Sequence, residues 1–202
     1  MFLVSLVHAK GEGAKQKEHL QSFQVCDAKD ICFQVLVFDA HVYGPNLPAF
    51  LEAAKKLPEG STILMSGYGR DLSSGVVVGE IIRQRKLHTW VGRIGKKHSS
   101  KNGFYVKTKG VCLSACAIAF AGGVNRQIDA EDKFGVTSLE PTRNDLKDPE
   151  YQQALADTQA YLRRMGVTES FFNFLKDLTG PKVRMLSLSD STSYGFKNYP
   201  KS

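Results

Sequence analysis

The sequence predicts an α/β fold with a mainly parallel β-sheet. Runs typical of strands alternate with runs typical of helices from about residue 31 onward, which favours this class. The 202 residues are enough for one domain with a substantial core, and the composition, 42% hydrophobic and 23% charged, is that of an ordinary globular protein. We therefore expect one domain over residues 23–202, preceded by a separate segment, residues 1–22.

The N-terminal segment suggests export. Residues 1–9 end in Val-His-Ala after a short apolar run, which is typical of the end of a signal peptide and its cleavage site. A first β-strand is the alternative interpretation. Residues 10–22 are polar, and we predict a loop there.

The four cysteines form two close pairs, Cys26 with Cys32 and Cys112 with Cys116. This pattern suits two local disulfides in an oxidising compartment, although four cysteines allow three connectivities and buried free thiols remain possible. The spacings are not those of familiar zinc sites, so we expect no metal. Together with the N-terminus, the cysteines favour a periplasmic or secreted protein over a cytoplasmic one.

The first half of the predicted domain contains alternating elements. Residues 31–38 are β-branched and aromatic enough for a strand, and residues 47–57 have the apolar face of a helix that ends before Gly60. A short buried strand is predicted over residues 61–67, followed by a glycine-bearing turn. A helix over residues 72–86 and a strand over residues 88–94 come next.

Residues 93–110 carry six Lys or Arg and no acid, and we predict an exposed hairpin. The chain has 27 Lys+Arg against 20 Asp+Glu, a net charge of +7. This balance permits binding to an anionic partner without requiring it. A solvated hairpin is the simpler interpretation, and nucleic-acid binding through Lys96, Lys97 and Lys101 is the less favoured one.

The second half is predicted to be richer in helices. The run 115–121 has no polar side, so a helix there would be buried all round. A short strand is expected near residues 134–136. A helix over residues 148–165 has Asp148 as its N-cap and Gly166 after its end. A second helix follows to Gly180, and Ser187 and Asp190 have the spacing of a capping box before a third.

One serine, Ser114, lies between two cysteines in the sequence Cys112-Leu113-Ser114-Ala115-Cys116. It is either a nucleophile at a helix N-terminus or a small residue in a packed core. The surrounding motifs are "SSGVVVGEIIRQRKLHTWV" (residues 73–91), "AFAGGVNRQI", "YLRRMGV" and "LSLSDSTSYGF". Their order over residues 60–198 resembles the Clp protease and crotonase superfamily, and most of all a periplasmic branch with a Cys-x-Ser-Ala-Cys motif. The resemblance implies a superhelix of repeated ββα units.

In the proteases of that superfamily the nucleophile begins a buried helix, where the helix dipole and free amides stabilise an oxyanion. The resemblance assigns this position to Ser114. It assigns the oxyanion donors to Ala115 and to the turn at Gly69 and Arg70, where Arg70 replaces a family glycine. The catalytic histidine position matches Thr137, and a serine needs a base within reach to lose its proton.

The carboxylate position of the triad matches Val183, so two of its three members are replaced. Substitute bases are His98 in the basic hairpin and Lys133 near Thr137. The remaining histidines, His8, His19, His41 and His88, are expected at the surface. A crotonase-like reaction on a CoA thioester would instead use Glu131 and Glu140, but no adenine-binding pattern supports it.

These observations predict a Clp protease-like protein with a degraded triad and a binding or assembly role toward a peptide or protein. The alternative is an active serine peptidase that uses Ser114 with a non-standard base. The resemblance implies a homo-oligomer. Neither a cofactor nor a membrane-spanning segment is expected from the sequence, and nucleic acid is not favoured. The two cysteines beside Ser114 are interpreted as a brace for its turn.

Overall fold

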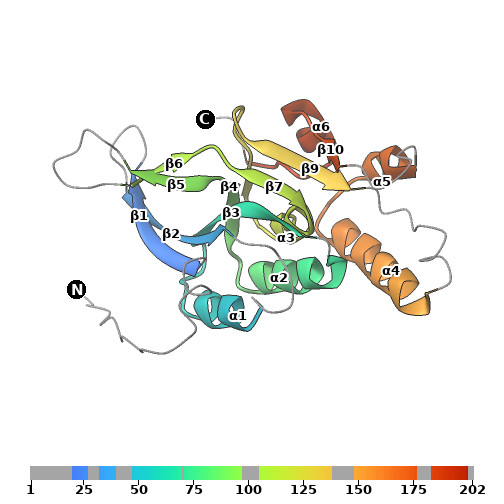
Figure 1. Cartoon of the computed structure of the whole chain (residues 1–202), viewed down its shortest axis with the longest axis horizontal. Helices are drawn as coiled ribbons and strands as arrows, with labels where there is room; N and C mark the ends of the chain where they lie inside the picture. Colours follow the sequence, from blue (N-terminus) through green and yellow to red (C-terminus); the bar gives the residue numbers. More distant parts are fainter. Residues whose placement is uncertain are drawn as a thin grey trace.

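The computed structural model describes residues 20–26, 32–39, 47–69, 71–96, 105–137, 148–176 and 183–199. In this part of the chain strands alternate with helices, as Figure 1 shows. The elements, in chain order, are β1 (Leu20–Cys26), β2 (Cys32–Asp39), α1 (Leu47–Lys55), β3 (Thr62–Gly69), α2 (Leu72–Gln84), β4 (His88–Val91), β5 (Arg93–Lys96), β6 (Tyr105–Thr108), β7 (Val111–Ser114), α3 (Ala115–Phe120), β8 (Arg126–Gln127), β9 (Lys133–Thr137), α4 (Pro149–Arg164), α5 (Glu169–Lys176), β10 (Val183–Met185) and α6 (Leu188–Ser193).

The strands form one sheet in the order β10-β9-β7-β3-β2-β1-β6-β5, and off this path β4 pairs with β3 and β8 pairs with β4. Strands β2, β3, β4, β7 and β9 pair in parallel with their neighbours in this centre. Antiparallel pairing is confined to β1–β2, β5–β6 and β9–β10. The predicted α/β class with a mainly parallel sheet is confirmed.

Strand β3 changes partner halfway along its length. Its first half, up to Met65, pairs with β4, and its second half, from Gly67, pairs with β7. Ser66 lies at this fork and is fully buried. Its hydroxyl accepts a hydrogen bond from the Val111 amide (3.2 Å) and contacts the Val111 carbonyl oxygen (3.3 Å). The first residue of β7 is thereby attached to β3 by a side chain where the ladder begins.

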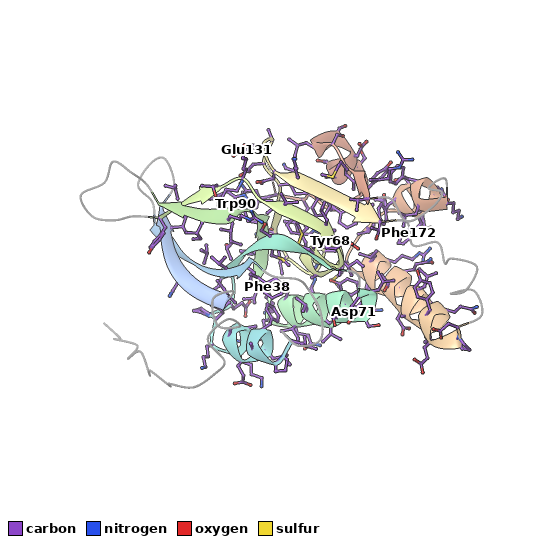
Figure 2. The ribbon with its side chains drawn as sticks, in the orientation of Figure 1. Phe38, Tyr68, Asp71, Trp90, Glu131 and Phe172 are labelled. Carbon is purple, nitrogen blue, oxygen red and sulfur yellow. A yellow bond between two sulfur atoms is a disulfide. The ribbon has the colours of Figure 1, made fainter. Side chains whose placement is uncertain are left out.

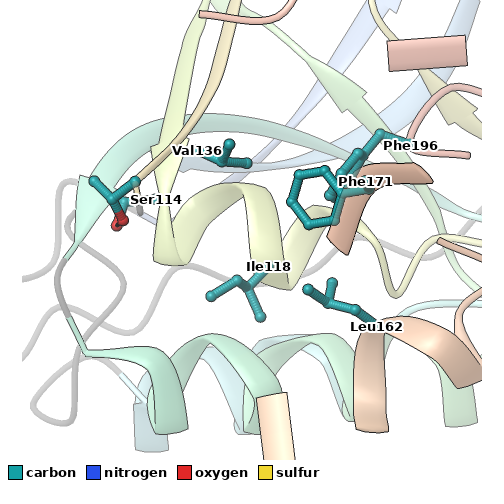
Figure 3. Close-up of a pocket in the computed structure, with 7 residues that line it drawn as sticks. Ser114, Ile118, Val136, Leu162, Phe171 and Phe196 are labelled. Atoms are coloured by element: carbon teal, nitrogen blue, oxygen red, sulfur yellow. Dashed lines mark hydrogen bonds between the residues drawn. The ribbon is translucent and has the colours of Figure 1, made fainter. Parts of the chain in front are cut away.

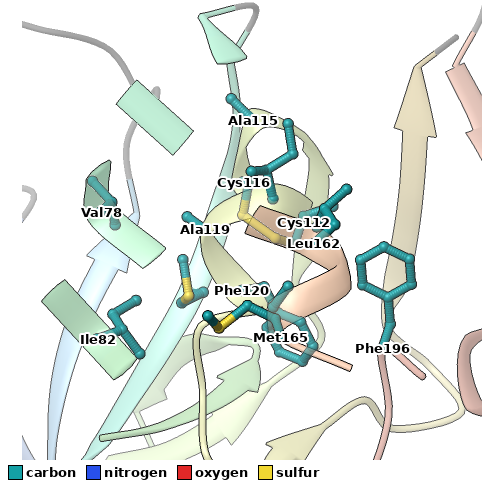
Figure 4. Packing of buried hydrophobic residues seen from close by; sticks show 14 of the residues in the cluster. Val78, Ile82, Cys112, Ala115, Cys116, Ala119, Phe120, Leu162, Met165 and Phe196 are labelled. Atoms are coloured by element: carbon teal, nitrogen blue, oxygen red, sulfur yellow. A yellow bond between two sulfur atoms is a disulfide. The ribbon is translucent and has the colours of Figure 1, made fainter. Parts of the chain in front are cut away.

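Helix α3 lies at the centre of the core, which Figure 4 shows from close by. Its six residues are all buried, as the apolar run predicts. Helix α2 packs closely on it through glycines. A Cβ atom at Gly75 would lie 2.9 Å from the Ala115 carbonyl oxygen of α3. One at Gly79 would lie 3.1 Å from the Ala119 carbonyl oxygen of α3 and 1.9 Å from the Tyr161 hydroxyl oxygen of α4. These positions admit only glycine without a shift of neighbouring atoms.

Two arginines bind the carbonyl groups at the end of α3. Arg126 is 4% exposed, and its Nη1 donates to the carbonyls of Ala121 (2.8 Å) and Met165 (2.7 Å). Arg83 donates to the Gly123 carbonyl (3.1 Å). Burial, followed by the nearby Arg83 charge, lowers the pKa of Arg126 to about 10. Cations at a helix C-terminus oppose its negative dipole end, so they stabilise this buried helix.

The predicted helix ends are confirmed. The Asp148 carboxylate accepts from the Glu150 amide (2.9 Å) at the start of α4, and Gly166 after its end has φ +84°. Ser187 and Asp190 form the complete capping box at the start of α6. No helix in the described ranges has both the length and the apolarity needed to cross a bilayer.

Three sequence-based expectations need correction. Strand β1 begins at Leu20, where a polar loop was expected through residue 22, because residues 20–26 pair along their whole length with β2. The short strands β7, β8 and β10 were not predicted, since two to four residues carry too little periodicity to recognise. The third correction concerns the basic hairpin.

Strands β5 and β6 do pair as a hairpin, but Lys107 is not a solvated cation. Its side chain is 7% exposed, and its ammonium binds Asp129 (2.8 Å) and the fully buried Asp132 (2.8 Å). Trp90 donates its indole N–H to Asp129 (2.9 Å), and the Lys107 ammonium lies 5.5 Å from its ring centre. We call Lys107, Trp90, Asp129 and Asp132 the root cluster, because Asp132 also accepts from the Gly110 amide (2.8 Å) just before β7.

Candidate functional site

Ser114 lies at the joint between β7 and α3 with φ +59° and ψ −118°. A positive φ is uncommon for a residue other than glycine, and such conformations cost about 1–3 kcal/mol unless the surroundings enforce them. A sharp, strained turn from a strand into a helix is the geometry that presents a nucleophilic serine in other hydrolases. The local conformation therefore favours a functional role over simple packing, although Ser114 is only 4% exposed.

The side-chain partner of Ser114 is Thr137. Their hydroxyl oxygens lie 2.9 Å apart, within hydrogen-bond distance. Thr137 ends β9, which runs parallel to β7 with Leu113 opposite Gly135, so the two side chains meet where both strands end. A threonine hydroxyl exchanges hydrogen bonds but does not accept a proton near neutral pH.

Val183 lies directly beyond Thr137. The two residues are opposite each other in the antiparallel β9–β10 pair. Such paired residues project to the same face with their Cβ atoms about 5 Å apart. Ser114, Thr137 and Val183 thus stand in a row on three neighbouring strands, and this row contains two hydroxyl groups and one hydrocarbon side chain.

On the other side of β7, Gly69 lies opposite Ser114 in the parallel β3–β7 pair. Arg70, the next residue, is outside the described residues. Ala115 is the first residue of α3, and the first amides of a helix have no acceptor within it. The strand end at Gly69 and the helix start at Ala115 therefore flank Ser114 from the two sides that the resemblance assigns to oxyanion donors.

A small apolar pocket opens beside the two hydroxyls (Figure 3). Its volume of about 10 Å³ corresponds to one water molecule. Besides Ser114 and Thr137, its walls are hydrocarbon or aromatic and come from α3, β9, α4, α5 and the segment after α6: Ile118, Val136, Leu162, Phe171 and Phe196. The pocket thus offers apolar contact next to a hydroxyl pair.

Other candidate bases lie far from Ser114. Lys133 is opposite Val111, three residues from Ser114 along β7, or roughly 10 Å, and its side chain is exposed. His88 is opposite Thr62, seven residues before Gly69 on β3, or roughly 23 Å away. Burial lowers the pKa of His88. Neither side chain approaches the serine.

Glu131 contacts the Lys107 ammonium of the root cluster at 3.8 Å. Figure 2 labels Glu131 and Trp90, which belongs to that cluster. It therefore belongs to the opposite end of β7 from Ser114. His98 and Glu140, as well as His8, His19 and His41, are outside the described residues. Lys96 ends β5, whereas Lys97 and Lys101 are also outside them.

The cysteine pair around Ser114 forms a disulfide. The Cys112 and Cys116 sulfurs are 2.03 Å apart, and the bond is drawn in yellow in Figure 4. In the backbone register of β1 and β2, Cys26 is opposite Cys32. Within the described residues no cluster of His, Cys, Asp and Glu suits a metal ion.

Comparison with known proteins identifies the fold. No family model matches the sequence, and no curated protein matches it. A ClpP1 mutant from Listeria monocytogenes superposes with a TM-score of 0.58 at 10% identity, covering 82% of this chain and 89% of that one. The ClpP protease catalytic domain from Plasmodium falciparum gives 0.57 at 11% identity, covering 83% and 85%. A peptidase from Plasmodium falciparum gives 0.56 at 8% identity, covering 82% and 93%.

At these identities the likeness concerns the fold alone. The chain has a Clp protease-like fold, in which a curled, mostly parallel sheet carries helices. The expectation of a Clp/crotonase-like architecture is therefore confirmed.

The apolar walls of the pocket were not found from the sequence. Leu162, Phe171 and Phe196 belong to α4, α5 and the segment after α6, and in the sequence each is an ordinary apolar residue of an amphipathic run. Only the three-dimensional packing of these elements against α3 brings them next to Ser114.

Proposed function

We propose that this protein is a non-catalytic, Clp protease-like protein with a binding or assembly role toward a peptide or protein. The observation that carries the proposal is the hydrogen bond between Ser114 and Thr137 at 2.9 Å, with Val183 as the next residue in the row. In the Clp proteases, by resemblance, the Thr137 and Val183 positions hold a histidine and a carboxylate.

The loss of a base is decisive for a serine nucleophile. Its hydroxyl attacks only when a neighbouring group takes the proton, and removing one triad member costs several orders of magnitude in rate. A threonine cannot take that proton, and a valine cannot orient a base. A binding or assembly role needs no base, so it is compatible with the residues at these two positions.

A second candidate function is an active serine hydrolase. The strained backbone at Ser114 supports it, because such strain is more often found at functional sites than in structural turns. In this case a base would come from a residue outside the described ranges, such as His98.

A fluorophosphonate probe separates the two functions, since it labels only an activated serine. We expect the wild type to remain unlabelled, like Ser114→Ala. The double variant T137H/V183D should label at least about 100-fold faster, because the register places the new side chains on one face of β9 and β10. Labelling of the wild type that disappears in Ser114→Ala would establish the hydrolase instead.

The double variant also tests why Ser114 is silent. If T137H/V183D folds with an unchanged circular dichroism spectrum and still does not label, the missing base is not the reason. T137N/V183N, which adds polar groups of similar size but no base, is the matched control and should not label.

We further propose that the protein works in the periplasm or outside the cell, and as a homo-oligomer. The disulfide beside Ser114 supports the first statement, because buried disulfides persist in oxidising compartments. Cell fractionation followed by mass spectrometry of the cysteines tests the location. Sedimentation of the purified protein tests the oligomeric state. A cytoplasmic protein with reduced cysteines, or a monomer, would contradict them.

A further inference from the structure

We propose that the Cys112–Cys116 disulfide is a positioning element of the Ser114 site, which holds the joint between β7 and α3 in its strained conformation. The relevance of this inference to binding rests on the proposed function. The effect on the backbone of Ser114 does not, because it can be measured whatever the site binds. It assigns a role in the site to two residues that touch neither the pocket nor Thr137 in any described contact.

The bond encloses the strained residue symmetrically. Cys112 is two residues before Ser114, on β7, and Cys116 is two residues after it, in the first turn of α3. The Cα atoms of the two cysteines are 5.3 Å apart. The crosslink therefore joins the end of β7 to the first turn of α3. Ser114 is the middle residue of the loop that the crosslink closes.

Both anchors of the bond are fixed in the core. Cys112 is fully buried and lies between Gly67 of β3 and Phe134 of β9, with which it is in register. Cys116 is also fully buried, in a helix that packs against α2. Because both ends lie in the core, the bond limits the conformations open to the residues between them.

Other contacts hold the Ser114 side chain or its place opposite Gly69 in the β3–β7 pair, but they do not span the turn. The hydroxyl pair with Thr137 holds the side chain, and the Ser114 side chain makes no capping hydrogen bond to α3. A residue with positive φ persists only where its surroundings over-determine it. The disulfide is the one covalent constraint that spans the turn in the described structure, so we assign the maintenance of φ +59° to it.

Because both sulfurs are fully buried, a dissolved thiol cannot reach the bond in the folded protein. The constraint is thus set when the chain folds and remains afterwards. This distinguishes a permanent positioning element from a redox switch, and it ties the geometry of the site to folding under oxidising conditions.

The test compares two double variants. C112A/C116A removes the proposed positioning element, and C26A/C32A removes the other cysteine pair, which the β2–β3 register places roughly 30 Å along the strand from Ser114. Crystal structures of both give the φ angle of Ser114 directly. We expect φ to leave the positive region and the Ser114–Thr137 hydrogen bond to break in C112A/C116A, and both to remain in C26A/C32A.

C112V/C116A, which restores part of the lost volume, replaces C112A/C116A if the latter does not fold. A φ that stays near +59° in either variant would overturn the proposal. As a second readout, the same substitutions in the T137H/V183D background should reduce fluorophosphonate labelling at least about 10-fold, with no such change from C26A/C32A. If T137H/V183D itself does not label, the proposed function is affected, whereas the backbone measurement still decides this inference.

Discussion

The two ends of strand β7 present opposite solutions to the burial of polar groups. At its start the root cluster buries the charges of Lys107 and Asp132, and each has partners: Lys107 binds two carboxylates, and Asp132 accepts from Lys107 and from the amides of Gly110 and Asp129. At its end Ser114 and Thr137 form a neutral pair beside hydrocarbon walls, and no charged group of the described residues takes part.

The difference indicates that the start of β7 stabilises the fold, whereas the Ser114 end does not. Charged groups in a core are tolerated when they are paired, and breaking such a pair is costly. The root cluster connects β4, β6 and the turn before β9, so it holds the start of β7 in place. The Ser114 end contains backbone strain instead, and strain does not stabilise a fold. Three predictions follow this contrast.

The largest effect is expected from Asp132→Ala. The substitution leaves the Lys107 ammonium in the core with Asp129 as its main partner, and it removes the acceptor of two backbone amides. We expect a loss of about 3 kcal/mol in the free energy of unfolding, or roughly 6–12 °C in Tm. Urea unfolding measures this loss.

Glu131→Gln, at an exposed position 3.8 Å from the same ammonium, is the control and should cost less than about 0.5 kcal/mol. Equal effects of the two variants would contradict the central role of Asp132.

A pH-dependent effect is expected from Asp129→Asn. Burial alone would raise the pKa of Asp129, but hydrogen bonds from Lys107 and Gln127 outweigh it, so the folded pKa is below the ordinary value of 3.8. The stabilisation by this carboxylate is therefore present above pH 3.8 and disappears as the pH falls through the folded pKa. At pH 7 the variant should lose about 1.5 kcal/mol, and the difference from wild type should shrink toward pH 2.

Urea titrations at several pH values measure this difference. Thr137→Val, at the uncharged end of β7, is the control, and its effect should not change with pH. Burial raises the pKa of Asp132, so its carboxyl contributes to the pH dependence of stability with the opposite sign to that of Asp129. The Asp129 variant is needed to separate the two contributions.

The smallest effect is expected from Ser114→Gly, and it is a gain in stability relative to Ser114→Ala. Glycine adopts positive φ without steric cost, so the variant should be more stable than Ser114→Ala by about 1 kcal/mol, even though both lose the hydroxyl. Thermal unfolding of the two variants measures the difference. A glycine variant that is less stable than the alanine variant would show that the serine conformation is not strained.

Much of the fold was predictable because its signals are local. The helix caps at Asp148, Ser187 and Gly166 are formed by residues a few positions apart, and the apolar run of α3 predicts burial wherever that helix lies. Short strands such as β8 and β10 are defined by their neighbours instead, so their own residues do not reveal them.

The site was predictable only in part for the same reason. The buried helix after Ser114 follows from the apolar run 115–121, whereas the position of Ser114 at its start came from the resemblance, and strand β7 before it was not predicted. The proximity of Thr137 came from the order of motifs in the resemblance, and periodicity alone does not supply it. The burial of Lys107 was missed because its acidic partners are more than twenty residues away, beyond any local pattern.

The pocket wall formed by Phe196 has a consequence for the order of events during synthesis. Phe196 packs on Phe134 and Phe171, near the far end of the described chain, whereas Cys112 and Cys116 leave the ribosome almost together with Ser114. Both cysteines and Ser114 are therefore synthesised before this part of the pocket wall. A chain that stops before Phe196 would contain both cysteines and Ser114 but would lack one wall of the pocket.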